Sequence, residues 1–164
     1  MHTELTDALR QRGWFIDDAA ACSVPELVAE RYEWVPPQVL ETLSSTGVVL
    51  APDKKSWLLT GAVFDGTVEA AFRWDEWERL SLESAIGDEE WAKSIVEFWD
   101  QHFPIAMSVR TGYGYLALRK SDLRVVVGEE PEFEETEEFS SSFFQLQLAL
   151  ESLEAGTLEW FEGL

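Results

Sequence analysis

The sequence offers few residues for nucleophilic or metal chemistry. It holds two histidines, His2 and His102, and a single cysteine, Cys22. A Ser-His-Asp or Cys-His system would have to use His102, because a residue beside a chain end is seldom held in place. No nucleophile elbow, phosphate-binding loop, dinucleotide fingerprint or Cys/His metal spacing is present. We therefore expect no catalytic residue, no metal ion and no cofactor, with His102 at a helix-to-strand junction and Cys22 buried or half-buried.

Carboxylates are the abundant reactive groups. The chain has 32 Asp and Glu against 12 Lys and Arg, a formal net charge of −20, and no Lys or Arg follows Arg124. A glycosidase would need two carboxyl groups roughly 5–9.5 Å apart, but so many acids make any single pair uninformative. The densest segment, residues 129–138, contains seven glutamates: Glu129, Glu130, Glu132, Glu134, Glu135, Glu137 and Glu138.

This acidic segment predicts either a solvated face or a recognition surface. If residues 130–134 are extended, Glu130, Glu132 and Glu134 share one face while Pro131 and Phe133 take the other, so Phe133 would anchor the segment to the body. A solvated face would aid solubility. A recognition surface would steer a basic partner toward it. Because exposed charges are screened beyond about 8 Å at physiological salt, that partner must come close.

The eight tryptophans are the second candidate set for recognition. We expect most of them in the core, but an exposed tryptophan among acids would be a binding hot spot. The sequence FRWDEWERL places Trp77 beside Asp75 and Glu76. The predicted partner-binding residues are therefore Asp75, Glu76 and Trp77 together with the seven glutamates.

Composition restricts the class of protein. A chain of 164 residues with 46% apolar residues suits one domain that folds without staples, and its aromatic content excludes global disorder. The acidic excess disfavours direct binding to nucleic acid or to an anionic membrane. No apolar run approaches a membrane span, the first residues carry charges instead of an apolar core, and the cysteine is alone. These features lead us to expect a cytoplasmic protein.

The hydrophobic pattern predicts helices at the two ends and strands between them. Asp65-Gly66 is a hairpin signal, Ser23 with Glu26 has the spacing of a capping box, and Gly156 should end the last helix. This order is typical of an α+β fold, a single domain with a central antiparallel sheet flanked by N-terminal and C-terminal helices. The expected helices are 3–12, 25–33, 37–46, one after Asp88, and 140–153; the expected strands are 48–50, 56–64, 67–74, 105–109, 113–119 and 124–128.

Residues 36–153 resemble the SUKH superfamily, bacterial immunity proteins related to a yeast cell-wall regulator. The resemblance starts at Pro37 and the short Leu-bearing helix that ends at Gly47, and continues at Trp57-Leu58. It is carried further by FPIA from Phe103, GYGYLAL from Gly112, VVVG from Val125, the Glu-rich turn, and a last helix with Phe143, Phe144 and Leu148. Residues 1–35 would be a helical extension and 154–164 an acidic tail.

The resemblance implies a non-enzymatic protein that binds and neutralises a cognate toxin, often a nuclease or deaminase. The net charge independently suggests a basic target, because glutamates could occupy a cationic surface meant for phosphate. The expected partner is a protein toxin with a basic surface, without nucleic acid or membrane, and the chain a monomer or weak homodimer. The alternative is an acidic interaction scaffold or DNA-mimic regulator without a toxin partner.

Overall fold

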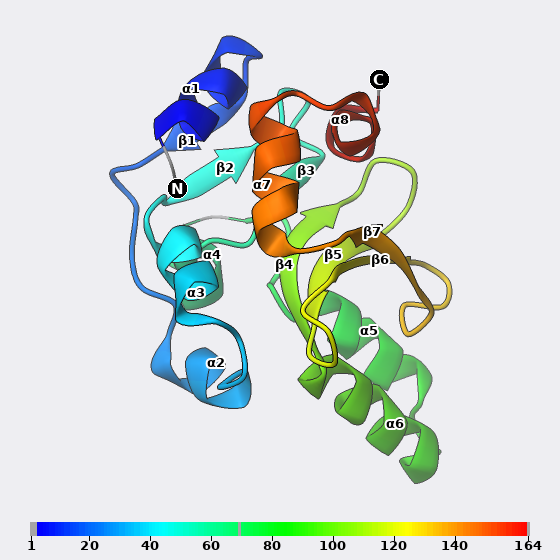
Figure 1. Cartoon of the computed structure of the whole chain (residues 1–164). Helices are drawn as coiled ribbons and strands as arrows, with labels where there is room; N and C mark the ends of the chain where they lie inside the picture. Colours follow the sequence, from blue (N-terminus) through cyan, green and yellow to red (C-terminus); the bar gives the residue numbers. More distant parts are fainter. Residues whose placement is uncertain (1–2, 69, 164) are drawn as a thin grey trace.

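Seven antiparallel strands form one sheet in which every strand pairs with its neighbours in sequence, in the order β1-β2-β3-β4-β5-β6-β7. The computed structural model describes residues 3–68 and 70–163 (Figure 1). The longest ladder joins β4 and β5, and it shifts register once, between Pro104 and Ala106. The strands are β1 Phe15–Asp17, β2 Val48–Leu50, β3 Ser56–Leu58, β4 His102–Ser108, β5 Gly114–Arg119, β6 Val125–Glu129 and β7 Thr136–Ser140.

Helices cover both faces of this sheet, as its alternating side chains require. Tyr115 of β5 contacts Trp99 on one face, with ring centroids 4.8 Å apart. Leu118 lies on the opposite face and shares a groove with Phe143. The helices are α1 Thr3–Gln11, α2 Glu26–Arg31, α3 Pro37–Ser44, α4 Gly61–Asp65, α5 Glu76–Ser84, α6 Glu89–Asp100, α7 Phe143–Glu151 and α8 Ala155–Glu162. Helix α6, packed with α5, thus covers one face of the sheet. Helix α7, which lies beside α1, covers the other.

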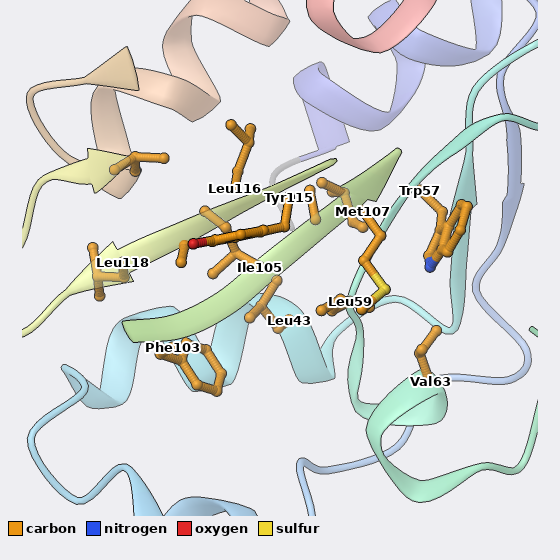
Figure 2. Packing of buried hydrophobic residues seen from close by; sticks show 14 of the residues in the cluster. Leu43, Trp57, Leu59, Val63, Phe103, Ile105, Met107, Tyr115, Leu116 and Leu118 are labelled. Atoms are coloured by element: carbon orange, nitrogen blue, oxygen red, sulfur yellow. The ribbon is translucent and has the colours of Figure 1, made fainter. Parts of the chain in front are cut away.

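The core is continuous across the middle of the sheet. Strand β4 is buried along its whole length, and β5 as far as Leu118. Figure 2 shows Phe103, Ile105 and Met107 of β4 packed with residues of β3 and α3. The fully buried large side chains are Trp77, Tyr32, Tyr115, Phe103, Phe161, Leu5, Leu9, Leu43, Leu59, Ile95, Ile105 and Met107. This architecture confirms the expected α+β single domain with an antiparallel sheet.

Three local predictions in the N-terminal half were wrong. The capping box is absent: the residue before α2 is Pro25, without a side-chain cap. The predicted strand 56–64 ends at Leu58, and the chain turns into helix α4. Gly66 ends that helix with a φ of 71°, and residues 67–68 and 70–74 do not form the expected hairpin strand.

The strand is shorter than predicted because the chain turns near Gly61, where it packs against the segment that contains Cys22. A Cβ on Gly61 would lie 1.8 Å from the carbonyl oxygen of Cys22, so only glycine allows this approach. Residues 59–64, which follow β3, are buried because they pack under neighbouring segments, and the sheet does not extend through them. A short buried helix and a buried strand both require a run of apolar residues, so the sequence pattern could not distinguish them here.

The C-terminal residues contain a helix that the sequence did not predict. Gly156 lies inside α8 instead of ending a helix, and residues 155–162 are helical instead of an acidic tail. The carboxylate of Glu162 accepts hydrogen bonds from the Arg12 guanidinium, at 3.0 Å, and the Trp14 indole, at 2.7 Å. These bonds hold α8 against the segment after α1. Within the two described ranges, no helix has the length and apolar character needed to cross a bilayer.

Candidate functional site

The acidic segment is a turn held to the core by its one aromatic residue. Phe133 is buried, and its ring stacks on Trp77 at a centroid distance of 5.7 Å. The hydroxyl of Tyr115 donates a hydrogen bond to the Phe133 carbonyl oxygen. Gly128 makes room for this tyrosine, since a Cβ there would lie 2.5 Å from its ring. The prediction that Phe133 anchors the segment is thus confirmed.

Around this turn, the structure contains a hollow of about 800 Å³, which we name the acidic hollow. Its floor is the end of the sheet on the face that carries Val127 and Glu137, which are paired in register. Helix α8, above this end of the sheet in Figure 1, contributes Glu159 and Trp160. The glutamates that line it are Glu129, Glu130, Glu132, Glu135, Glu137 and Glu159.

The charge of the acidic hollow is not compensated by the described residues. Arg110 is the one basic residue among those that line it. Its guanidinium is turned to other partners, the Asp53 carboxylate at 2.7 Å and the Phe161 carbonyl oxygen at 2.7 Å. None of the six lining glutamates forms an ion pair with a described Lys or Arg. Concentrated carboxylates with a concave shape give a local negative potential that attracts cations.

Glu130 lines the hollow and also forms a hydrogen bond that connects two turns. Its carboxylate accepts a hydrogen bond from the Tyr113 backbone N–H at 3.2 Å. This contact ties the turn after β6 to the turn before β5. Two turns that carry the wall of the hollow are therefore fixed to one another.

Two of the seven predicted glutamates lie elsewhere. Glu134 accepts a hydrogen bond from the Trp99 indole at 3.3 Å, on the side of α6. Glu138 forms an ion pair with Arg124. The expectation that Glu130, Glu132 and Glu134 share one extended face was wrong, because residues 133–134 form a turn. Five of the seven line the acidic hollow.

The second predicted cluster does not offer a recognition surface of the kind expected. Trp77 is 1% exposed, stacks on Tyr113 and Phe133, and donates its indole N–H to the Gly114 carbonyl oxygen at 3.2 Å. It is a core residue that supports the anchor, and a partner cannot contact it in this fold. Asp75 pairs with Arg73 at 2.9 Å and Glu76 with Arg79 at 3.0 Å. Their charges are thus balanced locally.

His102 occupies a structural position. Its Nδ1 is 2.8 Å from the Phe98 carbonyl oxygen, and its ring stacks on Phe98 with centroids 3.9 Å apart. Burial lowers the pKa of His102 below its ordinary value, which favours the neutral ring. His2 lies outside the described residues. Among residues 3–68 and 70–163, no three His, Cys, Asp or Glu side chains are grouped to hold a metal ion.

No protein-family model, curated protein or solved structure matches this chain. The SUKH resemblance therefore stays a prediction. Sequence reasoning missed the contribution of α8, Glu159 and Trp160. The signal was present: Leu158 and Phe161 are spaced as on one helical face, and Gly163 follows as a C-terminal cap.

Proposed function

We propose that this chain is a non-enzymatic immunity-type protein that binds and occludes a basic protein toxin through the acidic hollow. The observation that carries the proposal is the set of six lining glutamates without a described basic partner. Arginine or lysine side chains of a toxin would enter the hollow and pair with these carboxylates. Such pairing blocks cationic residues that the toxin needs for a phosphate-bearing substrate.

The resemblance to the SUKH superfamily supports the toxin as the class of partner. Members of that superfamily act by binding, without shared catalytic residues, and their targets are often nucleases or deaminases. The net charge of −20 agrees with a basic target of that kind. Complementary charge raises the rate of encounter and rejects acidic proteins, so the field of the hollow would contribute to specificity.

The shape of the hollow favours a protruding partner element. Trp160 gives the wall an aromatic surface beside the carboxylates. An arginine that enters can pair with a carboxylate and also lie over an indole ring.

The test is a calorimetric titration of the chain with the toxin-like protein encoded beside its gene, at 50 and 300 mM NaCl. We expect tight binding that weakens strongly with salt. Replacing Glu129, Glu132 and Glu137 by Gln should weaken binding about 100-fold, at about 1 kcal/mol for each lost pair. The matched control replaces Glu41, Glu83 and Glu154, which are exposed and lie outside the hollow, by Gln and should change the Kd less than twofold.

Two outcomes would contradict the proposal. If both triple variants lose the same affinity, net charge acts without the hollow. If no neighbouring gene product binds, the immunity role fails. Capture of a basic protein that is not a toxin would instead favour the acidic scaffold.

A further inference from the structure

A groove separate from the acidic hollow lies between helices α3 and α7. Its volume is about 290 Å³. Leu118 of β5 lines it, so it belongs to the face of the sheet that α7 covers. Two of its side chains remain open to solvent, Phe144 at 57% and Leu123 at 38% exposure. We name it the apolar groove, after the lining residues Pro36, Val39, Leu118, Leu123, Phe143 and Phe144.

The β5–β6 turn, which supplies Leu123 to this groove, carries the densest group of basic residues in the chain. Residues 119–124 hold three of the twelve Lys and Arg: Arg119, Lys120 and Arg124. Asp122 and Glu138 pair with the two arginines, and Lys120 is exposed. The apolar groove is therefore bordered by positive charge on the side of this turn, in a chain that is otherwise strongly acidic.

The turn between α5 and α6 has the opposite charge and an apolar surface of its own. In Figure 1 this turn is the end of the helix pair that points away from the sheet. Ile86 is 84% exposed there, and Trp91, in the first turn of α6, is 45% exposed. Between them lie three acids, Asp88, Glu89 and Glu90, and none of these pairs with a Lys or Arg in the described ranges. We name residues 86–91 the hairpin tip.

We propose that the hairpin tip of one copy of this chain docks in the apolar groove of a second copy. Trp91 and Ile86 cover the exposed rings and methyl groups of the groove, while the acids of the tip face the basic β5–β6 turn. Helices α6 and α7 lie on opposite faces of the sheet, so a copy cannot fill its own groove. The contact is therefore head to tail, and each pair keeps one free tip and one free groove for further copies.

Charge complementarity favours a second copy as the occupant. The sequence predicted an exposed tryptophan among acids at Trp77, and the structure has one at Trp91, with the properties of a binding hot spot. The net charge of −20 on each copy opposes association, but charges farther apart than about 8 Å are screened at physiological salt, so the opposite charges at the contact dominate. Because the contact is small, we expect weak association, with a Kd between about 10 µM and 1 mM.

The experiment is sedimentation equilibrium of the full chain at physiological salt. The mean mass should rise above the 18.7 kDa of one chain as the concentration passes through the expected Kd range. The tip variant is Ile86→Ser with Trp91→Gln, and the groove variant is Phe144→Gln with Leu123→Asn, since asparagine tolerates the φ of 57° at that position. Each variant alone should keep the mass of one chain. Their equal mixture should form pairs and nothing larger, because one variant keeps an intact groove and the other an intact tip.

Matched controls separate this contact from general stickiness and from net charge. Phe15→Thr with Leu27→Gln removes two apolar side chains of similar exposure outside the tip and the groove, and should associate as the parent chain does. Lys120→Glu should weaken association about fivefold, whereas Lys55→Glu, with the same change in net charge at another exposed site, should weaken it less than twofold.

A second measurement does not depend on the double variants. In the 15N-labelled parent chain, the Trp91 indole resonance, identified by its loss in Trp91→Phe, should shift with protein concentration.

The proposal is overturned if the parent chain keeps the mass of one chain up to about 1 mM, if the mixture of tip and groove variants forms no pairs, or if the Phe15 and Leu27 control loses association equally. A parent chain that stays single and binds a different protein at the groove would also overturn it. Circular dichroism shows whether each variant is folded. The triple Gln variant of the acidic hollow should still associate, so this proposal and the toxin proposal stand or fall independently.

Discussion

Replacement of Tyr115 by Phe should loosen the acidic segment by removing one hydrogen bond. Tyr115 is fully buried, and its hydroxyl donates to the Phe133 carbonyl oxygen. Burial, helped by the charge of Glu134, raises the pKa of Tyr115, so the hydroxyl remains a neutral donor at physiological pH. The substitution keeps the ring and leaves the carbonyl of a buried residue without this donor.

The expected cost follows from that unsatisfied carbonyl. Leaving a buried acceptor unpaired costs about 1–3 kcal/mol, and no large cavity adds to this because the phenyl ring fills nearly the same space. At about 2–4 °C for each kcal/mol in a chain of this length, a loss of about 2 kcal/mol lowers the Tm by about 4–8 °C. The control is Tyr113→Phe, because the Tyr113 hydroxyl makes no hydrogen bond within the described part of the chain.

The assay is urea unfolding followed by far-UV circular dichroism. The slope m, the dependence of the unfolding free energy on urea concentration, is compared between the variants. Tyr113→Phe should stay within about 0.5 kcal/mol of the parent chain. Amide hydrogen exchange at residues 130–135 should rise in Tyr115→Phe alone, since the turn loses its tie to β5. Equal stability of the two variants, or unchanged exchange in the turn, would refute the view that this bond positions the acidic segment.

Two further outcomes follow from close contacts elsewhere. Gly61→Ala should destabilise the chain by about 3 kcal/mol, since its Cβ would overlap the Cys22 carbonyl oxygen, whereas Gly156→Ala, with nothing within 4 Å, should stabilise α8 by about 0.5–1 kcal/mol in the same urea assay. The hydrogen bond from Arg12 lowers the pKa of Glu162, with a further lowering from the Trp14 indole against the opposing effect of burial. The carboxylate therefore contributes stability that is full above its unfolded pKa of 4.5 and is lost as the pH falls through its lower folded value. Unfolding measured from pH 7 to pH 3 should show the difference between the parent chain and Glu162→Gln shrinking, and a difference that stays constant would contradict this assignment.

The sheet was largely predictable because its central strands carry clear signals. The alternation in residues 113–119 and the apolar run at Val125 gave strands within a residue or two of β5 and β6. Asp88 was predicted to open a helix, and its side chain does accept the Trp91 backbone N–H at 3.0 Å. Local propensity and tertiary packing agree at these places, so the pattern was sufficient.

Predictions failed where distant segments decide the local structure. The turn at Gly61 depends on the Cys22 carbonyl, 39 positions away in the chain, which no local pattern reveals. Trp77 has acids on both sides in sequence, yet it is buried by contacts with Tyr113 and Phe133. The acidic neighbours in sequence suggested that Trp77 is exposed. Its side chain is buried by residues that come later in the chain.

The acidic hollow also depends on distant residues, and this has a consequence for how the protein matures. Each strand joins the sheet next to its predecessor in sequence, so the sheet can grow in the direction of synthesis. The walls of the hollow come from β4 onward, and α8 is the last of them in chain order. A nascent chain would therefore complete the acidic hollow only after α8 has been synthesised, and a ligand that recognises the hollow would bind only chains that have reached this point.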